Sequence, residues 1–205
     1  MIGMENAIFF SGTHGTGKTT TIEQVEKTLR IPIYDENRDH GNPYEQPFMR
    51  QIWRLTHYYL YALKIAEMQK SDRLLADRCV FDHQAYTQTF CDLGWISQDE
   101  YNMLQRLRRT YFDDSKLLPQ NVVLFFPPED WTIERIKERW TREKKKWREG
   151  DLDYLKRLRD NYLRLFDAEN ERRKVCVVRD TDLEKRITTI KEFIEKVFPS
   201  RNNKK

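Results

Sequence analysis

A glycine-rich segment near the start of the chain carries the clearest chemical signal. Residues 8–24 read IFFSGTHGTGKTTTIEQ, in which Gly12, Gly17, Lys18 and Thr19 fit the spacing G-x-x-x-x-G-K-[ST]. Glycine tolerates the positive φ angles that let consecutive backbone N–H groups converge on one anion. The helix predicted to follow adds unpaired N–H groups and the positive end of its dipole. The pattern therefore predicts a loop that binds the phosphates of a nucleoside triphosphate.

The side chains of this loop have separate expected roles. We expect Lys18 to reach the outer phosphates and the hydroxyl group of Thr19 to ligate Mg²⁺. The expected ligand is therefore a nucleoside triphosphate, with Mg²⁺ as cofactor, and the family resemblance described below implies that it is ATP. The predicted ATP-binding residues of the loop are Thr13, His14, Gly15, Thr16, Gly17, Lys18, Thr19 and Thr20.

The composition limits the class of protein. The chain has 205 residues, of which 39% are hydrophobic and 34% charged, with a net charge of +4. These values suit one domain that binds small anions, and they do not require a nucleic-acid partner. The three cysteines form no C-x-x-C, so neither a disulfide framework nor a zinc site is predicted. No apolar run nears the roughly 20 residues of a membrane span, so we expect a cytoplasmic protein, and we leave a homodimer open.

Five short apolar runs alternate with helical patterns along the chain. The expected strands are residues 7–11, 31–34, 73–77, 121–126 and 174–179. The expected helices are residues 20–29, about 45–70, two within 83–109, 131–146, 151–170 and 182–197. This alternation predicts a single α/β domain over residues 1–199, with a parallel sheet of about five strands, followed by a disordered basic tail over 200–205. The active site of such a sheet lies beyond the carboxyl ends of its strands.

Charged side chains follow the second and third predicted strands. Residues 34–48, YDENRDHGNPYEQPF, carry Glu36 and Arg38 in a turn-rich stretch that can be a solvated loop or part of the site. Asp77 ends the third strand and Arg78 follows it directly. An aspartate here can approach a metal ion, and an arginine can bind a phosphate in bidentate fashion. The alternative is that this pair only caps the next helix.

Residues 131–151, WTIERIKERWTREKKKWREGD, form the densest basic stretch. Arg135, Arg139 and Arg142 recur at spacings of four and three, so we expect them to share one face of a helix. A charge run is ordinarily a solvated face. Beside a triphosphate site it can also be a mobile lid, over about 135–152, whose arginines bind ATP and neutralise the transferred phosphoryl group.

Three stretches, taken in order, resemble a known family: GTHGTGKTT, ADRCVFDHQAY, and ERIKERW followed by YLKRLRDNYLRLF. They look like the thymidylate kinase and deoxynucleoside kinase group of P-loop nucleoside and nucleotide kinases. Asp77, Arg78, Ala85 and Tyr86 match an Asp-Arg-x-x-x-x-x-x-Ala-Tyr stretch of thymidylate kinases. Glu36 matches the Glu that acts as base after the second strand in deoxynucleoside kinases. The resemblance implies strand order 2-3-1-4-5 and phosphoryl transfer from Mg·ATP to a small nucleoside or nucleoside monophosphate.

The resemblance also implies roles for individual residues, although thymidylate kinases carry Asp where this loop has His14. Asp35 is the alternative to Glu36 as base. The aromatic residues of the acceptor site could stack on a base or belong to the core. The implied catalytic residues are Lys18, Glu36, Asp77, Arg78 and Arg139. The implied metal ligands are Thr19 and Asp77. The implied acceptor-binding residues are Glu36, Arg38, Trp53, Tyr58, Arg78 and Phe81.

Other proteins with such a loop fit less well or stay open. A GTPase needs Asn-Lys-x-Asp and Asp-x-x-Gly, and neither occurs. A mechanical ATPase usually ends an apolar strand with Asp-Glu, whereas here Arg78 follows Asp77. A kinase of another small hydroxyl acceptor, a polynucleotide 5′-end kinase and an ATP-binding module without chemistry are the remaining alternatives. Measuring ATP turnover with and without candidate acceptors separates them.

Overall fold

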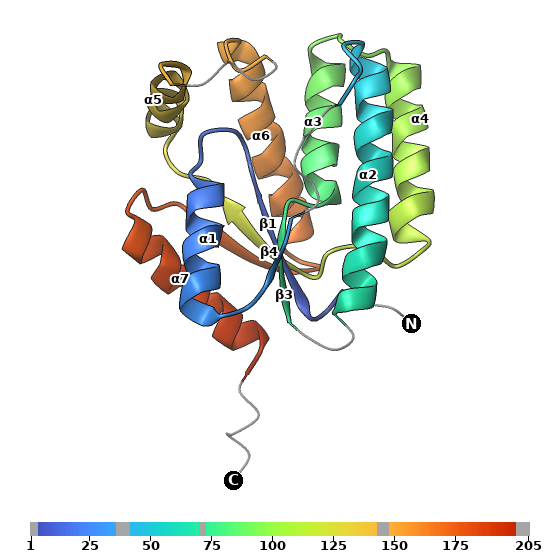
Figure 1. The fold of residues 1–205 in the computed structure, drawn as a ribbon. Helices are drawn as coiled ribbons and strands as arrows, with labels where there is room; N and C mark the ends of the chain where they lie inside the picture. The colour runs from blue at the N-terminus through green and yellow to red at the C-terminus, as the bar shows by residue number, and fades with distance from the viewer. Residues whose placement is uncertain (1–3, 36–41, 70–72, 143–147, 200–205) are drawn as a thin grey trace.

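The computed structural model describes residues 4–35, 42–69, 73–142 and 148–199. A five-stranded sheet lies between two layers of helices (Figure 1). Every strand pair is parallel and the order is β2-β3-β1-β4-β5, which confirms the predicted fold class and strand order. The strands are β1 (Ala7–Gly12), β2 (Ile33–Tyr34), β3 (Leu74–Asp77), β4 (Asn121–Phe125) and β5 (Lys174–Val178).

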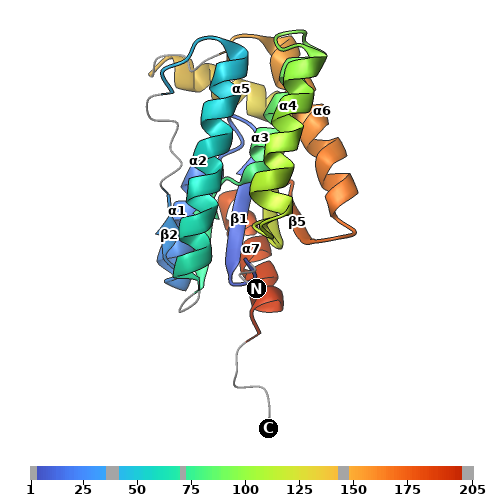
Figure 2. The same cartoon turned by 90° about the vertical axis from the view of Figure 1, so that its right-hand side faces the viewer.

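The helices cover both faces of the sheet. Figure 1 shows α1 and α7 on one side and α2, α3, α4 and α6 on the other, and Figure 2 shows α5 near the upper end. The helices are α1 (Lys18–Leu29), α2 (Pro47–Met68), α3 (Val80–Asp92), α4 (Gln98–Arg108), α5 (Glu129–Trp140), α6 (Leu152–Glu169) and α7 (Leu183–Val197). A short π-helical segment, η1 (Arg109–Asp113), follows α4. Among the described residues, none of the helices has the length and apolar character needed to cross a membrane.

The central strand β1 contributes to a separate core on each side of the sheet. Ala7 and Phe9 pack into the larger cluster, which includes residues of α2, α3, α4 and α6. Ile8 and Phe10 pack into the smaller cluster with α1 and α7. Because side chains alternate along a strand, an unbroken apolar run serves both faces. The strand pairs with both β3 and β4, so the carboxyl ends of all three meet where the glycine-rich loop begins.

Two predicted helix boundaries are wrong. The helix expected over 131–146 ends at Trp140, and the hydroxyl group of Thr141 donates a 2.7 Å hydrogen bond to the carbonyl of Glu138. Arg142 therefore lies beyond α5 and does not share a helix face with the other two arginines. The helix expected from residue 83 begins at Val80, because the carboxylate of Asp82 accepts the N–H of Cys79 at 2.9 Å and caps the first turn. Residues 143–147 and 200–205 lie outside the described residues.

Candidate active site

Residues 13–17 connect β1 to α1, and α5 packs directly against them. Gly15 has a φ of 73°, and a Cβ atom placed there would lie 2.6 Å from Cγ1 of Ile136 and 2.8 Å from the carbonyl oxygen of Thr132. No other residue type fits this position without displacing α5. Gly17, with a φ of 74°, is the N-cap of α1, and the first turn of that helix carries no acidic residue. The loop thus ends on a helix N-terminus that favours an anion.

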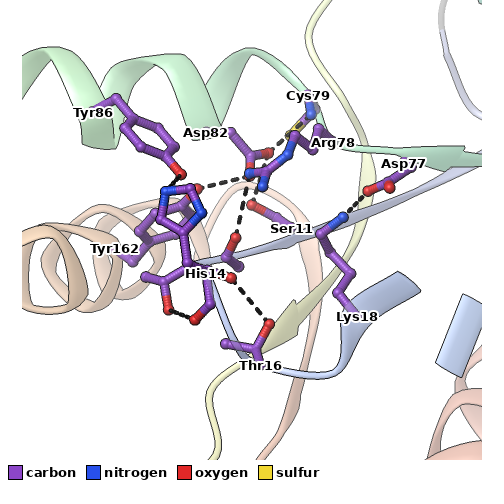
Figure 3. Close-up of polar contacts among 12 residues, drawn as sticks. Ser11, His14, Thr16, Lys18, Asp77, Arg78, Cys79, Asp82, Tyr86 and Tyr162 are labelled. Atoms are coloured by element: carbon purple, nitrogen blue, oxygen red, sulfur yellow. Dashed lines mark hydrogen bonds and ion pairs between the residues drawn. The ribbon is translucent and has the colours of Figure 1, made fainter. Parts of the chain in front are cut away.

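Lys18 begins α1 and forms an ion pair with the carboxylate of Asp77 at the end of β3 (Figure 3). The lysine side chain is only 6% exposed. Tyr61 fixes the strand ends around this pair, because its hydroxyl group donates to the carbonyl of Tyr34 at 2.6 Å and to that of Asp77 at 3.2 Å. The structure therefore brings together two of the predicted catalytic residues, one from the loop and one from the neighbouring strand.

The residues proposed to hold a metal ion suit magnesium chemistry. Asp77 offers a carboxylate and Thr19, exposed in the first turn of α1, offers a hydroxyl group. Oxygen ligands of this kind suit Mg²⁺, which is usually held by one or two carboxylates together with substrate phosphates. No cluster of three or more His, Cys, Asp or Glu side chains that could cage a metal occurs in the described part of the chain. The oxygen atoms of Thr19 and Asp77 therefore suit an Mg²⁺ ion that binds together with a nucleotide.

Arg78 belongs to a buried polar network that the sequence analysis did not anticipate. Its Nη1 donates to Oδ1 of Asp82 at 3.0 Å and to the carbonyl of Gly12 at 3.4 Å. Asp82 is fully buried and also accepts hydrogen bonds from the hydroxyl groups of Ser11, at 3.0 Å, and Tyr162, at 2.7 Å (Figure 3). The only sequence signal for it was an aspartate four residues after an arginine at the start of a helix. Arg78 also has a φ of 73°, a conformation that costs a non-glycine residue about 1–3 kcal/mol.

His14 joins the loop to two other parts of the site. One ring nitrogen, Nε2, lies 2.9 Å from the hydroxyl group of Tyr86 (Figure 3). The other, Nδ1, lies 3.1 Å from Oε1 of Glu149. Burial lowers the pKa of His14, so its ring is neutral near pH 7. In that form Nδ1–H donates to Glu149 and Nε2 accepts from Tyr86, an assignment that rests on the hydrogen-bond network.

Glu149 lies between the loop and α5. It is fully buried, accepts from His14 and forms an ion pair with Arg139. Burial alone would raise its pKa, but the hydrogen bond from His14 and the guanidinium of Arg139 together lower the pKa to about 2. Its carboxylate is therefore ionised throughout the physiological range. The sequence offered little signal for this residue, since it appeared only as one acid after a run of basic residues.

The aromatic residues predicted to stack on a base divide between the core and the surface. Phe81 is 1% exposed and packs edge-to-face on Phe166, with ring centroids 5.7 Å apart. Tyr58 is 5% exposed and faces His83. Both residues belong to the larger core cluster, and their contact with an acceptor stays a prediction. Trp53 is half-buried and stacks on His57 at 3.6 Å, and the guanidinium of Arg54 covers the ring of Tyr86 at 5.0 Å.

The structure describes only some of the remaining predicted residues. Glu36 and Arg38 fall within 36–41, outside the described residues, and Asp35 is half-buried directly after β2. Arg135 lies on α5, where its guanidinium packs over the ring of Trp131 at 4.9 Å. Arg142 is exposed beyond the end of α5.

Comparisons with known proteins agree with this geometry. The deoxynucleoside kinase family model matches residues 8–201. Three similar solved structures are of deoxyadenosine kinase from M. mycoides. The one with bound dCTP has a TM-score of 0.77 at 24% identity, and the alignment covers 93% of this chain and 99% of that chain. The one with dCMP and a flexible dCDP scores 0.73 at 23% identity, covering 93% and 99%. The one with dATP scores 0.73 at 21% identity, covering 92% and 99%.

No curated protein matches the sequence significantly. The family match spans nearly the whole chain and is independent of that search. It settles the open choice between an enzyme and a binding module in favour of phosphoryl transfer. The chain belongs to the deoxynucleoside kinase family and is an enzyme that phosphorylates nucleosides with ATP.

Proposed function

We propose that the acceptor is a 2′-deoxynucleoside, whose hydroxyl group receives the γ-phosphoryl group of ATP, and not a nucleoside monophosphate. The observation that carries this proposal is the position of Arg78, the arginine expected to clamp a phosphate acceptor. Its guanidinium is held by the buried carboxylate of Asp82, inside the network with Ser11 and Tyr162. A monophosphate is already anionic near pH 7 and needs cations around it. Because Asp82 is itself fixed by the hydroxyl groups of Ser11 and Tyr162, we expect Arg78 to keep this partner and not to turn to a phosphate acceptor.

The groups around His14 support the same conclusion. The Tyr86 hydroxyl group and the Glu149 carboxylate both bond to His14 and so fix the loop that is proposed to hold the phosphoryl donor. Glu149 also pairs with Arg139, so this cluster of described residues offers no unpaired cation for an anionic acceptor.

The phosphoryl donor would be bound by the glycine-rich loop and the lid. In this proposal Lys18 and the loop amides hold the triphosphate, and Arg135, Arg139 and Arg142 approach it from α5 and the residues after it. Lys18 would then exchange its ion pair with Asp77 for the outer phosphates. Phosphoryl transfer depends mainly on positioning and on cations near the transferred group, so this arrangement is what the reaction requires.

The acceptor hydroxyl must lose a proton as its oxygen bonds to phosphorus. We assign that role to Glu36, with Asp35 as the alternative, because both are carboxylates that come directly after β2 in the sequence. Thr19 and Asp77 would hold Mg²⁺. A magnesium ion bound with ATP supplies positive charge to the phosphate oxygens.

The base of the acceptor is proposed from the similar structures. The M. mycoides enzyme is described with dATP, dCTP and dCMP. Adenine and cytosine carry an amino group, N6 or N4, at the position where guanine and thymine carry a carbonyl oxygen, O6 or O4. Deoxyadenosine and deoxycytidine are therefore the acceptors we propose first for this chain.

An acceptor panel tests the proposal. Purified protein with Mg²⁺ and γ-labelled ATP is given the four common deoxynucleosides and, separately, their monophosphates, and the labelled product is identified. We expect label on deoxyadenosine or deoxycytidine and none on monophosphates. Label only on monophosphates would overturn the proposal and would return Arg78 to the role of an acceptor clamp.

Three further predictions accompany this function. They are a cytoplasmic location, an oligomeric state for which a homodimer stays open, and a kinase domain over residues 1–199 with a lid at about 135–152. Fractionation, sedimentation and limited proteolysis, respectively, test them.

A further inference from the structure

Arg186, in the first turn of α7, is bonded to the glycine-rich loop. Its Nη1 donates to the carbonyl oxygen of Thr16 at 3.0 Å and its Nε donates to that of Asp180 at 2.6 Å. The side chain is only 3% exposed. A Cβ atom on Gly17 would lie 2.5 Å from the same Nη1, so the guanidinium fills the space that a side chain at position 17 would take. No motif in the sequence pointed to this contact.

The bond to Thr16 determines the direction of the next amide group. The described residues contain no cis peptide bond. In a trans peptide the C=O and N–H groups point to opposite sides. Since Arg186 holds the Thr16 oxygen toward α7, the N–H of Gly17 must point the other way, to the side on which the loop would hold phosphates.

The guanidinium also changes the strength of that amide as a donor. A cation that bonds to a carbonyl oxygen draws electron density from the amide and makes its N–H more positive, and this polarisation is larger in a poorly solvated site. The effect on Gly17 N–H is additional to the helix dipole of α1, because both raise the positive potential at the same loop.

The surroundings of the buried Arg186 guanidinium favour a negative charge nearby. Its guanidinium lies over the ring of Trp131 at 4.7 Å, and the guanidinium of Arg135 packs on the same ring at 4.9 Å. Among the described residues, its Nη2 is buried without a hydrogen-bond partner. A buried cation with an unpaired N–H group and a like charge nearby costs free energy, which the carboxylates of Asp180 and Asp182 reduce. A triphosphate on the far side of the Thr16–Gly17 peptide would reduce this cost further through its negative charge, without a direct bond to Arg186.

We propose that Arg186 is a positioning residue for ATP: it orients and polarises the Thr16–Gly17 peptide so that the amide of Gly17 binds the triphosphate more strongly. The inference rests on the assignment of this loop as the ATP site. Arg186 acts through the peptide and not on the acceptor, so its effect is confined to the nucleotide donor.

The chain offers a matched control in Arg173. That side chain is similarly buried, and its Nη1 donates to the carbonyl of Pro119 at 2.8 Å while its Nε donates to Glu169 at 2.6 Å. It lies just before β5, at the amino edge of the sheet and therefore away from the loop. Replacing it removes an equivalent bond without touching the site.

The experiment compares Arg186→Gln, Arg186→Lys and Arg173→Gln for ADP affinity by calorimetry, for the KM of ATP and of the acceptor, and for Tm. We expect Arg186→Gln to weaken ADP binding and raise the KM of ATP by about tenfold or more, the factor expected for a charge-assisted hydrogen bond. Arg186→Lys should recover part of this loss. The KM of the acceptor should stay within about twofold. Arg173→Gln should lower Tm without weakening ADP binding.

Two outcomes would overturn the inference. One is unchanged ADP affinity in Arg186→Gln, or in Arg186→Lys if the Gln variant does not fold. The other is an equal loss of ADP affinity in Arg173→Gln, which would make the effect one of general stability. Lys18→Ala is measured alongside. If that variant also binds ADP normally, the loop is not the ATP site, and the error lies in the proposed function rather than in the role of Arg186.

Discussion

Nδ1 of His14 lies 3.1 Å from Oε1 of Glu149, which joins the phosphate loop to the residues that follow the basic stretch. Because Glu149 also pairs with Arg139, one buried carboxylate connects the loop and α5. Any movement of the proposed lid away from the loop must therefore break either the contact between His14 and Glu149 or the ion pair between Glu149 and Arg139.

The pKa of Glu149 makes stability depend on pH. Its pKa is lowered from 4.5 to about 2 in the folded protein. The unfolded chain takes up the proton near pH 4.5 and the folded protein does so only near pH 2. The carboxylate therefore stabilises the fold above about pH 4.5, and this contribution is lost progressively as the pH falls toward 2. We expect the Tm of the unmodified protein to fall more steeply between pH 5 and 3 than that of Glu149→Gln. The exposed Glu23→Gln should follow the unmodified protein, and parallel curves for all three would contradict the assignment.

Lys18→Ala tests the phosphate loop. The variant removes the cation proposed to bridge the outer phosphates, so we expect turnover to fall by roughly 10²-fold or more, as for other electrostatic stabilisers of the transition state. Lys27→Ala, an exposed position on the same helix, is the control and should keep normal turnover. Steady-state kinetics with ATP and the best acceptor measure both. Near-normal turnover in Lys18→Ala would contradict the proposal that this loop binds the phosphates of ATP.

Gly15→Ala tests the packing of α5 on the loop. The added methyl group would lie 2.6 Å from Cγ1 of Ile136, and alanine at a φ of 73° is strained. Gly94 has a similar φ of 66°, but a Cβ atom placed there would meet nothing within 4 Å, so Gly94→Ala isolates the strain. We expect Gly94→Ala to cost about 1 kcal/mol and Gly15→Ala at least ~2 kcal/mol, together with weaker ADP binding. Denaturant unfolding measures the difference, and equal costs would mean that α5 moves away freely.

Arg139→Ala tests the lid. We expect turnover to fall at least about tenfold, because an arginine near the transferred group stabilises its charge. Arg157→Ala, which removes an exposed arginine of α6, is the control and should keep normal turnover.

The proposed movement of the lid is tested by limited proteolysis of residues 140–150. Cleavage should slow when Mg·ATP and an acceptor are added, and an unchanged cleavage rate would argue against closure.

Glu36→Gln tests the catalytic base. A carboxylate that accepts the proton of the acceptor hydroxyl contributes typically ~10²–10⁴-fold, so a loss of that size is expected in kcat with little change in the KM of ATP. Asp35→Asn is the companion variant and should lose much less. A larger loss in Asp35→Asn would identify Asp35 as the catalytic base. Unchanged kcat in both variants would show that neither residue is the base.

Local patterns were enough to predict the sheet and the loop. The unbroken apolar run of β1 and the glycine spacing after it are properties of neighbouring residues, so they could be read without tertiary structure. The strand order came from the family resemblance, because nothing in a single strand specifies its neighbours.

Contacts between distant residues could not be predicted in the same way. Ser11 and Asp82 are 71 residues apart, and Thr16 and Arg186 are 170 apart. Each acquires its role from the fold, and no local spacing marks it. Periodicity likewise could not predict that Tyr58 and Phe81 are buried, since an aromatic side chain at helical spacing suits a core and a ligand site equally.

The separation of Thr16 and Arg186 along the chain has a consequence for protein synthesis. The loop residues leave the ribosome early, but both strands that flank β1 are made much later, because Ala7 pairs with Leu74 and Ile8 pairs with Asn121. The contact on the Thr16 carbonyl forms only when α7 has been made as well. A nascent chain that still lacks α7 therefore carries the glycine-rich motif without the contact that holds the Thr16 carbonyl, and we expect it to bind nucleotide more weakly than the complete domain.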